Sequence, residues 1–220
     1  MKRKITVILV DDHAVVRAGF KLLLDTSTHI EVVAEADRGE QVIQLLQQHQ
    51  PDIIVMDLSM PGIGGLETIK RIMQRDESVR ILVFSVHDEL VYINRAMAAG
   101  AKGYITKNSA PEILTEAISH IMQGQEYIEH GLLKEVSNQT SENDYQNIIE
   151  TFSAREFDIF SLLAKGLTVH KIAGELCLGY KTVANYSTQI KKKLKISSIA
   201  ELAHIAVMVG VMKHGMSSMD

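Results

Sequence analysis

The sequence has little cysteine and no long hydrophobic run, and both shortages limit what the protein can be. Cys177 is the only cysteine among 220 residues, so no disulfide can form within the chain, and a cytoplasmic location is expected. No apolar run reaches the roughly eighteen residues of a membrane-spanning helix, so we expect no membrane partner. The apolar stretch after the basic start Met1–Lys4 ends at Asp11, too early for a signal peptide.

Motifs of several site classes are missing as well. No GxxxxGK[ST] motif occurs, so a P-loop nucleotidase has no support. The nine histidines show no metal-ligand spacing, and the chain has no internal repeats. The candidates for chemistry are instead carboxylates that follow predicted strands.

Charge divides the chain into two parts. From Glu150 onward there are nine Lys/Arg and six Asp/Glu residues, a net of +3, whereas the whole chain carries −4, which leaves −7 on residues 1–149. The chain is long enough for two domains, and a hydrophobic content of 46% suffices for their cores. The asymmetry predicts a different partner for each half.

Short apolar runs alternate with helical patterns over residues 1–124. Strands are predicted near 5–10, 31–35, 52–56, 80–84 and 103–106, and helices near 13–25, 39–49, 65–75, 89–99 and 110–123. Valine- and isoleucine-rich strands between helices are typical of a parallel sheet covered on both faces. The predicted fold class is therefore α/β, a doubly wound five-stranded parallel sheet. Its last helix is expected to begin with a capping box at Ser109–Glu112.

A polar stretch separates this domain from a helical one. Residues 137–147 contain no aliphatic side chain, so residues 125–150 are predicted to be a linker, with a short helix near 128–136. Residues 151–215 show only helical patterns and begin with a second capping box, Ser153–Glu156. Two of their helices, joined by a tight turn near Leu178-Gly179, predict a small all-α helix-turn-helix domain.

Acidic residues follow two of the predicted strands. The first strand runs into Asp11 and Asp12, and the third runs into Asp57. Because the carboxyl ends of parallel strands form the ligand crevice of an open α/β sheet, these carboxylates are expected to converge. Converging carboxylates repel one another unless a hard cation lies between them. The pattern predicts a Mg²⁺ site built from Asp11, Asp12, Asp57 and the backbone carbonyl of Ser59.

Two further strand ends carry the polar side chains of Ser85 and Lys107. A carboxylate can accept a phosphoryl group covalently, and an ammonium beside Asp57 would offset the charge of that group. The protein would then contribute positioning and charge neutralisation rather than acid–base catalysis, so the chain is not expected to be an enzyme.

Each of these residues has a simpler explanation when it is taken singly. Asp11 or Asp12 would cap the helix that starts near Val15, Ser85 would be an ordinary loop serine, and Lys107 a solvated charge. Their shared position at the strand ends of one sheet favours the phosphoryl site.

The motifs Asp11-Asp12, Asp57-Leu-Ser-Met-Pro-Gly62, Ser85 and Tyr104-Ile-Thr-Lys107 closely resemble the receiver domain of two-component response regulators. Met60-Pro61-Gly62 followed by Gly65-Leu66-Glu67 resembles the NarL/FixJ subfamily.

The resemblance implies a flavodoxin-like receiver in which Asp57 accepts a phosphoryl group from a histidine kinase. It implies that Asp12 binds Mg²⁺ directly and Asp11 through water. Ser85 and Tyr104 take the positions of the two switch residues, and His87 a position that tunes the lifetime of the phosphoryl group. Gly64 departs from the pattern, because relatives often carry Asp or Asn there, and it predicts a more flexible loop.

A basic helix is predicted from about Tyr180 to Leu194. At about 100° per residue, Val183, Tyr186, Ile190 and Leu194 form one inward stripe. Small and polar residues with lysines at both ends suit a helix in the major groove, where lysines bind phosphates and central residues approach base edges. A solvated, lysine-rich surface helix is the alternative. The predicted DNA contacts are Lys181, Thr182, Ala184, Asn185, Thr188, Lys192 and Lys195.

The second half resembles the LuxR-type helix-turn-helix through Phe152-Ser-Ala-Arg-Glu156, Leu163-Ala-Lys-Gly-Leu167, Ile172-Ala173, Lys181-Thr182-Val183 and Lys193-Leu194. The resemblance implies a transcription factor that binds promoter duplex DNA as a homodimer and has RNA polymerase as a partner. Gly179 replaces the usual Ser or Thr before the recognition helix, and Ala184 a frequent lysine.

Three rival functions stay open at this point. A phosphatase of the haloacid-dehalogenase type needs a second acid two residues after the nucleophile, where this chain has Ser59. In the second rival the receiver is an interaction module that works without phosphorylation, and in the third the basic helix binds protein or RNA. The first rival is the weakest, because the residue that it requires is missing.

Overall fold

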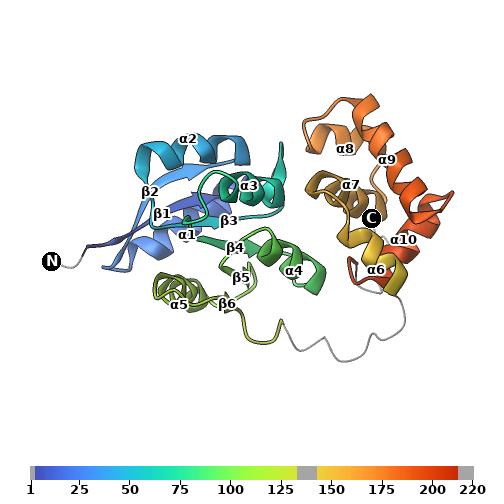
Figure 1. Cartoon of the computed structure of the whole chain (residues 1–220). Coiled ribbons are helices and arrows are strands. Elements are labelled where there is room, and N and C mark those ends of the chain that lie inside the picture. The colour runs from blue at the N-terminus through green and yellow to red at the C-terminus, as the bar shows by residue number, and fades with distance from the viewer. Residues whose placement is uncertain (1–2, 133–142, 213–220) are drawn as a thin grey trace. The chain divides into compact units, whose positions relative to one another are not determined.

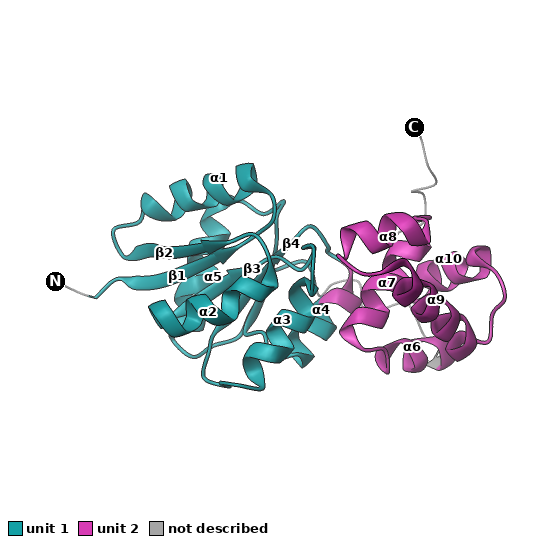
Figure 2. Ribbon diagram, turned by 90° about the horizontal axis from the view of Figure 1, so that it is seen from above, with its two compact units in different colours: residues 1–88, 93–133 teal, residues 89–92, 134–220 magenta. Residues whose placement is uncertain are grey.

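The computed structural model describes residues 3–132 and 143–212. The chain divides into two compact units, one formed by residues 1–88 and 93–133 and the other by residues 89–92 and 134–220 (Figure 2). No helix among the described residues is long and apolar enough to cross a membrane. Each unit is built on its own secondary structure.

The first unit is a parallel sheet whose strands alternate with helices (Figure 1). The strand order is β2-β1-β3-β4-β5-β6, so the chain reverses its direction of winding between β1 and β3. The bounds of the elements are β1 Ile5–Val10, α1 Ala14–Asp25, β2 Ile30–Ala36, α2 Gly39–His49, β3 Ile53–Met56, α3 Gly64–Met73, β4 Ile81–Ser85, α4 Leu90–Ala98, β5 Gly103–Thr106, α5 Pro111–Met122 and β6 Tyr127–Ile128.

The two faces of the sheet are buried by alternate residues of the same strands. Val7, Leu9 and Val55 share one cluster with Leu24 of α1 and Ile118 of α5, so α1 and α5 cover that face. The intervening strand residues are equally buried, as the fully buried β3 run Ile53–Met56 requires. The predicted α/β class is confirmed by this arrangement, and the predicted strands and helices lie within two residues of the observed ones.

The sheet has six strands, and the prediction of five was wrong. β6 is a two-residue strand that pairs in parallel with Gly103 and Tyr104 of β5. It lies inside the segment that was expected to be a linker, and its strand residue Ile128 occupies the start of the short helix predicted near 128–136. Residues 133–136 of that predicted helix lie outside the described residues.

Helix α5 does not begin with the predicted capping box. Its N-cap is Ala110, which provides no side-chain hydrogen bond, and Pro111 is the first helical residue. The Ser109 hydroxyl instead donates to the Glu129 carboxylate at 2.5 Å. Proline at the first helical position lacks an amide hydrogen that would need an acceptor, and its fixed φ suits the start of a helix.

The second unit is helical, with α6 Asn143–Glu150, α7 Ala154–Ala164, α8 Val169–Glu175, α9 Tyr180–Leu194 and α10 Ile199–Met208. Helix α6 was not predicted and takes up the end of the expected linker. Phe157, Phe160, Val183, Ile190 and Leu202 are fully buried and form part of the core that these helices share.

Capping explains where several of these helices begin. Ser153 and Glu156 form the predicted capping box of α7, and Ser198 and Glu201 form another at α10. Thr168 caps α8 by accepting a hydrogen bond from the Lys171 amide. Helices α8 and α9 are joined by a short turn, which is the predicted helix-turn-helix.

Candidate functional site

Asp57 lies directly after β3, at the carboxyl end of an interior strand. Asp57 is only 2% exposed, and its Oδ1 accepts a hydrogen bond of 3.2 Å from the Ser59 amide. Its own amide donates to the Val10 carbonyl at 2.8 Å, which fixes it beside the end of β1. The carboxylate is therefore held in the crevice that parallel strands form at their carboxyl ends.

Asp11 and Asp12 follow β1 and share this crevice. Ligand atoms of Asp11, Asp12, His13 and Asp57 all lie within 4.8 Å of one another. Asp11 accepts a hydrogen bond of 2.8 Å from the His13 amide, and helix α1 has no side-chain cap. The capping explanation for these two aspartates is therefore wrong.

Lys107 joins the two buried carboxylates. Its Nζ lies 2.6 Å from Asp11 Oδ2 and 2.7 Å from Asp57 Oδ2, and its side chain is 8% exposed. Burial alone would lower the pKa of the Lys107 ammonium, but the charges and hydrogen bonds of Asp57 and Asp11 outweigh burial, so this pKa is raised. Lys107 is therefore a buried, charged partner of the carboxylates and not a solvated surface lysine.

For the pKa of the Asp57 carboxyl, burial outweighs the interaction with Lys107. Burial raises its pKa, and the nearby charge of Asp11 adds to this, while Lys107 and the Ser59 amide oppose it without reversing the shift. Asp12 Oδ1 is buried and makes no hydrogen bond among the described residues, although it lies 2.8 Å from His13 Nδ1. The site thus has an excess of carboxylate oxygen, which a bound cation would stabilise in the ionised form.

The remaining predicted pocket residues lie at the ends of β4 and β5. Ser85 is fully buried, and its hydroxyl lies 3.3 Å from the His87 amide. His87 Nε2 lies 3.1 Å from the Ser59 hydroxyl. Tyr104 is fully buried and donates a hydrogen bond of 2.8 Å to the His87 carbonyl. The Tyr104 side chain therefore points inward, toward the segment that carries His87.

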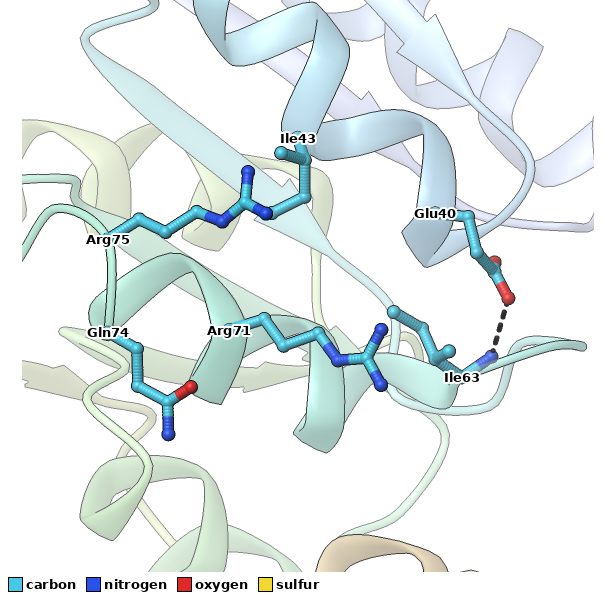
Figure 3. Close-up of a pocket in the computed structure, with 6 residues that line it drawn as sticks. All are labelled: Glu40, Ile43, Ile63, Arg71, Gln74 and Arg75. Atoms are coloured by element: carbon cyan, nitrogen blue, oxygen red, sulfur yellow. Dashed lines mark hydrogen bonds between the residues drawn. The ribbon is translucent and has the colours of Figure 1, made fainter.

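A hollow of about 490 Å³ lies elsewhere in the same unit, between α2 and α3 (Figure 3). Glu40, Ile43 and Arg75 are among its lining residues, and none of the acidic cluster is. Glu40 also accepts a hydrogen bond of 3.0 Å from the Ile63 amide, which supports the loop after Asp57. The hollow is therefore a neighbour of that loop and not part of the acidic site.

Helix α9 presents the predicted basic face. Lys181, Thr182, Asn185, Thr188, Lys192 and Lys195 are exposed, whereas Ala184 is half-buried. On the opposite side Val183, Ile190 and Leu194 are buried as predicted, but Tyr186 is only half-buried and Ser187 is buried. Gly179 is the N-cap without a side-chain bond, as its residue type requires. The polar and basic residues are free to face a partner of this helix.

Comparison with known proteins assigns the family. Residues 7–119 match the family described as the response regulator receiver domain, and residues 150–206 match the bacterial regulatory proteins of the luxR family. The chain belongs to the response regulators. With its receiver and LuxR-type helix-turn-helix in this order, it is a NarL/FixJ-type transcription factor of a two-component system.

Two curated relatives span almost the whole response regulator. The transcriptional activator protein ExaE of Pseudomonas putida is 38% identical over 209 residues, which cover 94% of this chain and 98% of the relative. The response regulator UvrY of Escherichia coli K12 is 36% identical over 208 residues, covering 94% and 95%. Both alignments therefore include the receiver and the helix-turn-helix domain of this chain.

Solved structures agree with this fold. A LuxR-family response regulator from Aurantimonas is 38% identical, with a TM-score of 0.59, and covers 60% of this chain and 95% of its own. The RcsB response regulator of Salmonella typhimurium covers 95% and 100%, with a TM-score of 0.69. At 24% identity this second likeness shows the fold alone.

The sequence did not show the place of His13 or the backbone conformation of Gly64. His13 enters the acidic cluster although no histidine spacing indicated a metal site, because strand β1 and helix α1 bring it there. Gly64, which departs from the family pattern, has a left-handed backbone with φ +72°. Glycine adopts this conformation without strain.

Proposed function

We propose that Asp57 accepts a phosphoryl group from the phosphohistidine of a histidine kinase. The observation that carries this proposal is the buried Asp57 carboxylate, which lies within 4.8 Å of other carboxylates and 2.7 Å from the Lys107 ammonium. A carboxylate oxygen of Asp57 attacks phosphorus, the P–N bond of the phosphohistidine breaks, and the imidazole nitrogen keeps the electron pair. The product is an aspartyl phosphate.

Mg²⁺ is the cofactor that this donor set fits. Asp11, Asp12 and Asp57 supply carboxylate oxygens that lie within 4.8 Å of one another, and such oxygens are the ligands that Mg²⁺ prefers. The Ser59 carbonyl completes the proposed ligands. When bound, the ion neutralises charge on the carboxylates and on the incoming phosphoryl group.

The other pocket residues position the phosphoryl group. Lys107, already paired with Asp57, would pair with a phosphoryl oxygen instead. The buried Ser85 hydroxyl is the proposed donor for a second oxygen, and His87, which is hydrogen-bonded to Ser59, is proposed to tune the lifetime of the aspartyl phosphate. No residue of this proposed site acts as a general acid, so only slow self-dephosphorylation is expected of the chain and no turnover of phosphomonoesters.

Phosphorylation is proposed to control promoter binding by the second unit. Lysines at both ends of α9 would bind phosphates, and Asn185 and Thr188 would approach base edges. A dimer would bind two half-sites, as symmetric helix-turn-helix proteins do, and RNA polymerase would be the further partner. RcsB, whose fold this chain shares, has been solved as two dimers bound to two parallel DNAs, which supports the dimer proposed for this chain.

The test of the phosphoacceptor is phosphate incorporation from acetyl phosphate in the presence of Mg²⁺. The wild-type chain is expected to incorporate about one phosphate, and the Asp57→Ala variant none, because the carboxylate that would attack phosphorus is gone. Removal of Mg²⁺ with a chelator is expected to stop incorporation by the wild type. An Asp57→Ala protein that still gains phosphate would overturn the assignment.

A further inference from the structure

The segment that leaves the sheet is fastened to the loop that carries Lys107. β6 ends at Ile128, and the amide of the next residue, Glu129, donates to the Tyr104 carbonyl at 3.1 Å. Glu129 Oε2 then accepts hydrogen bonds from the Thr106 amide at 2.9 Å, the Ser109 hydroxyl at 2.5 Å and the Thr106 hydroxyl at 3.3 Å. One carboxylate oxygen thus gathers three donors from the end of β5 and the loop after it.

The Glu129 side chain supplies the hydrogen-bond acceptor that the backbone of a neighbouring strand would otherwise supply here. The Thr106 amide is the next donor along the β5 edge after Tyr104, but β6 has ended, so no strand carbonyl continues the ladder. A buried amide without an acceptor costs free energy, and the carboxylate supplies that acceptor. The contact is therefore a charge-assisted extension of the sheet and stronger than a neutral bond.

Thr106 and Lys107 stand between this contact and the phosphoryl site. Lys107 follows Thr106 directly, its ammonium pairs with Asp57 and Asp11, and its amide donates to the Ser85 carbonyl at 2.8 Å. A phosphoryl group on Asp57 would change the partner of Lys107. The backbone on which that side chain moves is held from the other side by Glu129.

We propose that Glu129 is a positioning residue that holds Lys107 toward Asp57 and couples the phosphoryl site to the chain leading to the DNA-binding unit. The inference rests on the proposed phosphorylation of Asp57. Glu129 suits this role because it directly follows β6, its carboxylate accepts hydrogen bonds from the residues beside Lys107, and the chain continues from it toward α6. Loss of its carboxylate would remove the hydrogen bonds to Thr106 and Ser109 and leave the backbone bond from the Glu129 amide to the Tyr104 carbonyl in place.

The experiment compares full-length wild type with Glu129→Ala, and with Glu126→Ala as a matched control. Glu126 is an exposed carboxylate of the same charge three positions earlier in the chain. Each protein is incubated with acetyl phosphate and Mg²⁺, and the rate of phosphate incorporation, the lifetime of the aspartyl phosphate and the DNA affinity before and after phosphorylation are measured.

Glu129→Ala is expected to incorporate phosphate more slowly and to lose most of the phosphorylation-dependent gain in DNA affinity, a loss of about fivefold or more. Its affinity before phosphorylation is expected to match wild type, which a general loss of folding would not leave unchanged. Ser109→Ala, which removes one of the three donors, is expected to shift both quantities in the same direction by a smaller factor. Glu126→Ala is expected to match wild type.

If Glu129→Ala incorporates phosphate at the normal rate and its DNA affinity rises on phosphorylation as much as that of wild type, the coupling role is overturned. The proposed function would remain intact. Loss of the gain in Glu126→Ala to the same extent would also overturn it, because the effect would then follow net charge. A wild-type protein that takes up no phosphate would overturn the proposed function and this inference together.

Discussion

At the scale of single residues, the position of Asp57 depends on a glycine in the helix that follows it. A Cβ on Gly65 would lie 2.4 Å from the Asp57 carbonyl oxygen and 2.6 Å from Leu58 Cα. Both neighbours are backbone atoms of the segment that carries the nucleophile, so they cannot move aside as a flexible side chain would. The absence of a side chain at Gly65 therefore sets how closely α3 approaches the site.

We predict that Gly65→Ala displaces the Asp57 backbone, slows phosphate incorporation and destabilises the protein by about 1–3 kcal/mol, as overpacking does. Gly19→Ala is the matched control, because Gly19 lies within α1 and nothing approaches its Cβ position within 4 Å. Its alanine is expected to stabilise by about 0.5–1 kcal/mol. Urea unfolding and acetyl phosphate labelling of both variants measure the two effects, and equal behaviour of the two alanines would contradict the prediction.

Single residues also show how far the sequence could predict the site. Asp11, Asp57, Ser85 and Lys107 lie at strand ends, and parallel pairing alone brings such positions to one edge, so their proximity was predictable. The place of His13 was not, because it depends on how the chain turns from β1 into α1. The contacts of the Glu129 carboxylate were not predictable either, since its donors Thr106 and Ser109 are 23 and 20 positions away in sequence.

At the scale of elements, the start of α7 is tied to the last turn of α9. Glu156 accepts from the Ser153 amide at 2.9 Å and pairs with Lys193 at 2.6 Å, and Lys193 Nζ lies 5.4 Å from the centre of the Phe152 ring. Burial would raise the pKa of Glu156, but the Lys193 and Ser153 interactions outweigh it, so this pKa is lowered. Lys193 is thereby engaged within the domain, unlike the lysines of the predicted DNA face.

A lowered pKa in the folded state gives a stability that depends on pH. The contribution of Glu156 is fully present above the pKa of an unfolded glutamate, about 4.3, and is lost as the pH falls through the lower folded value. We predict that Glu156→Gln is less stable than wild type at pH 6 by at most about 1 kcal/mol and that this difference shrinks on acidification. Urea unfolding between pH 3 and pH 6, with exposed Glu150→Gln as control, measures it. A difference that does not change with pH would contradict the prediction.

The exposed face of α9 makes a different prediction for its lysines and its asparagine. Lys181→Ala and Lys192→Ala are expected to weaken binding to all DNA sequences and to lower the slope of log affinity against log salt by about one each. Asn185→Ala is expected to change base preference with little change of that slope. Fluorescence anisotropy with target and scrambled duplexes at several salt concentrations separates the two. Equal losses on both duplexes for Asn185→Ala would remove its role in base reading.

Helices and strands differ in how well they could be predicted from the sequence. Helix α9 was predicted with its observed bounds, since its apolar stripe and the preceding glycine mark both face and start. β6 was missed because a two-residue strand carries no alternation, and only the β5 edge makes it a strand. The burial of Ser187 was missed because the predicted stripe contained only apolar and aromatic residues, whereas the structure buries Ser187 and leaves Tyr186 half-buried.

At the scale of the whole molecule, the uneven charge restricts how the proposed phosphorylation would act on DNA binding. Residues 1–149 carry a net −7 and residues 150–220 a net +3, and an aspartyl phosphate adds further negative charge to the acidic part. Duplex DNA repels that part, so phosphorylation cannot raise DNA affinity through long-range electrostatics. Any increase in DNA affinity on phosphorylation must come from a change in the accessibility or the dimerisation of the DNA-binding units.

Pairing gives the clearest prediction in the native cell. If phosphorylation pairs two DNA-binding units, the wild-type protein should occupy discrete sites that contain two half-sites, spaced by about 10–10.5 base pairs or a multiple of this. Genome-wide occupancy of wild type and Asp57→Ala, at matched protein levels, is the measurement. We expect these sites to lose occupancy in Asp57→Ala, because this variant lacks the proposed phosphoacceptor. Sites that persist unchanged in Asp57→Ala would support DNA binding by the second half but contradict control by phosphorylation. A lack of discrete sites in both strains under inducing conditions would contradict sequence-specific DNA binding itself.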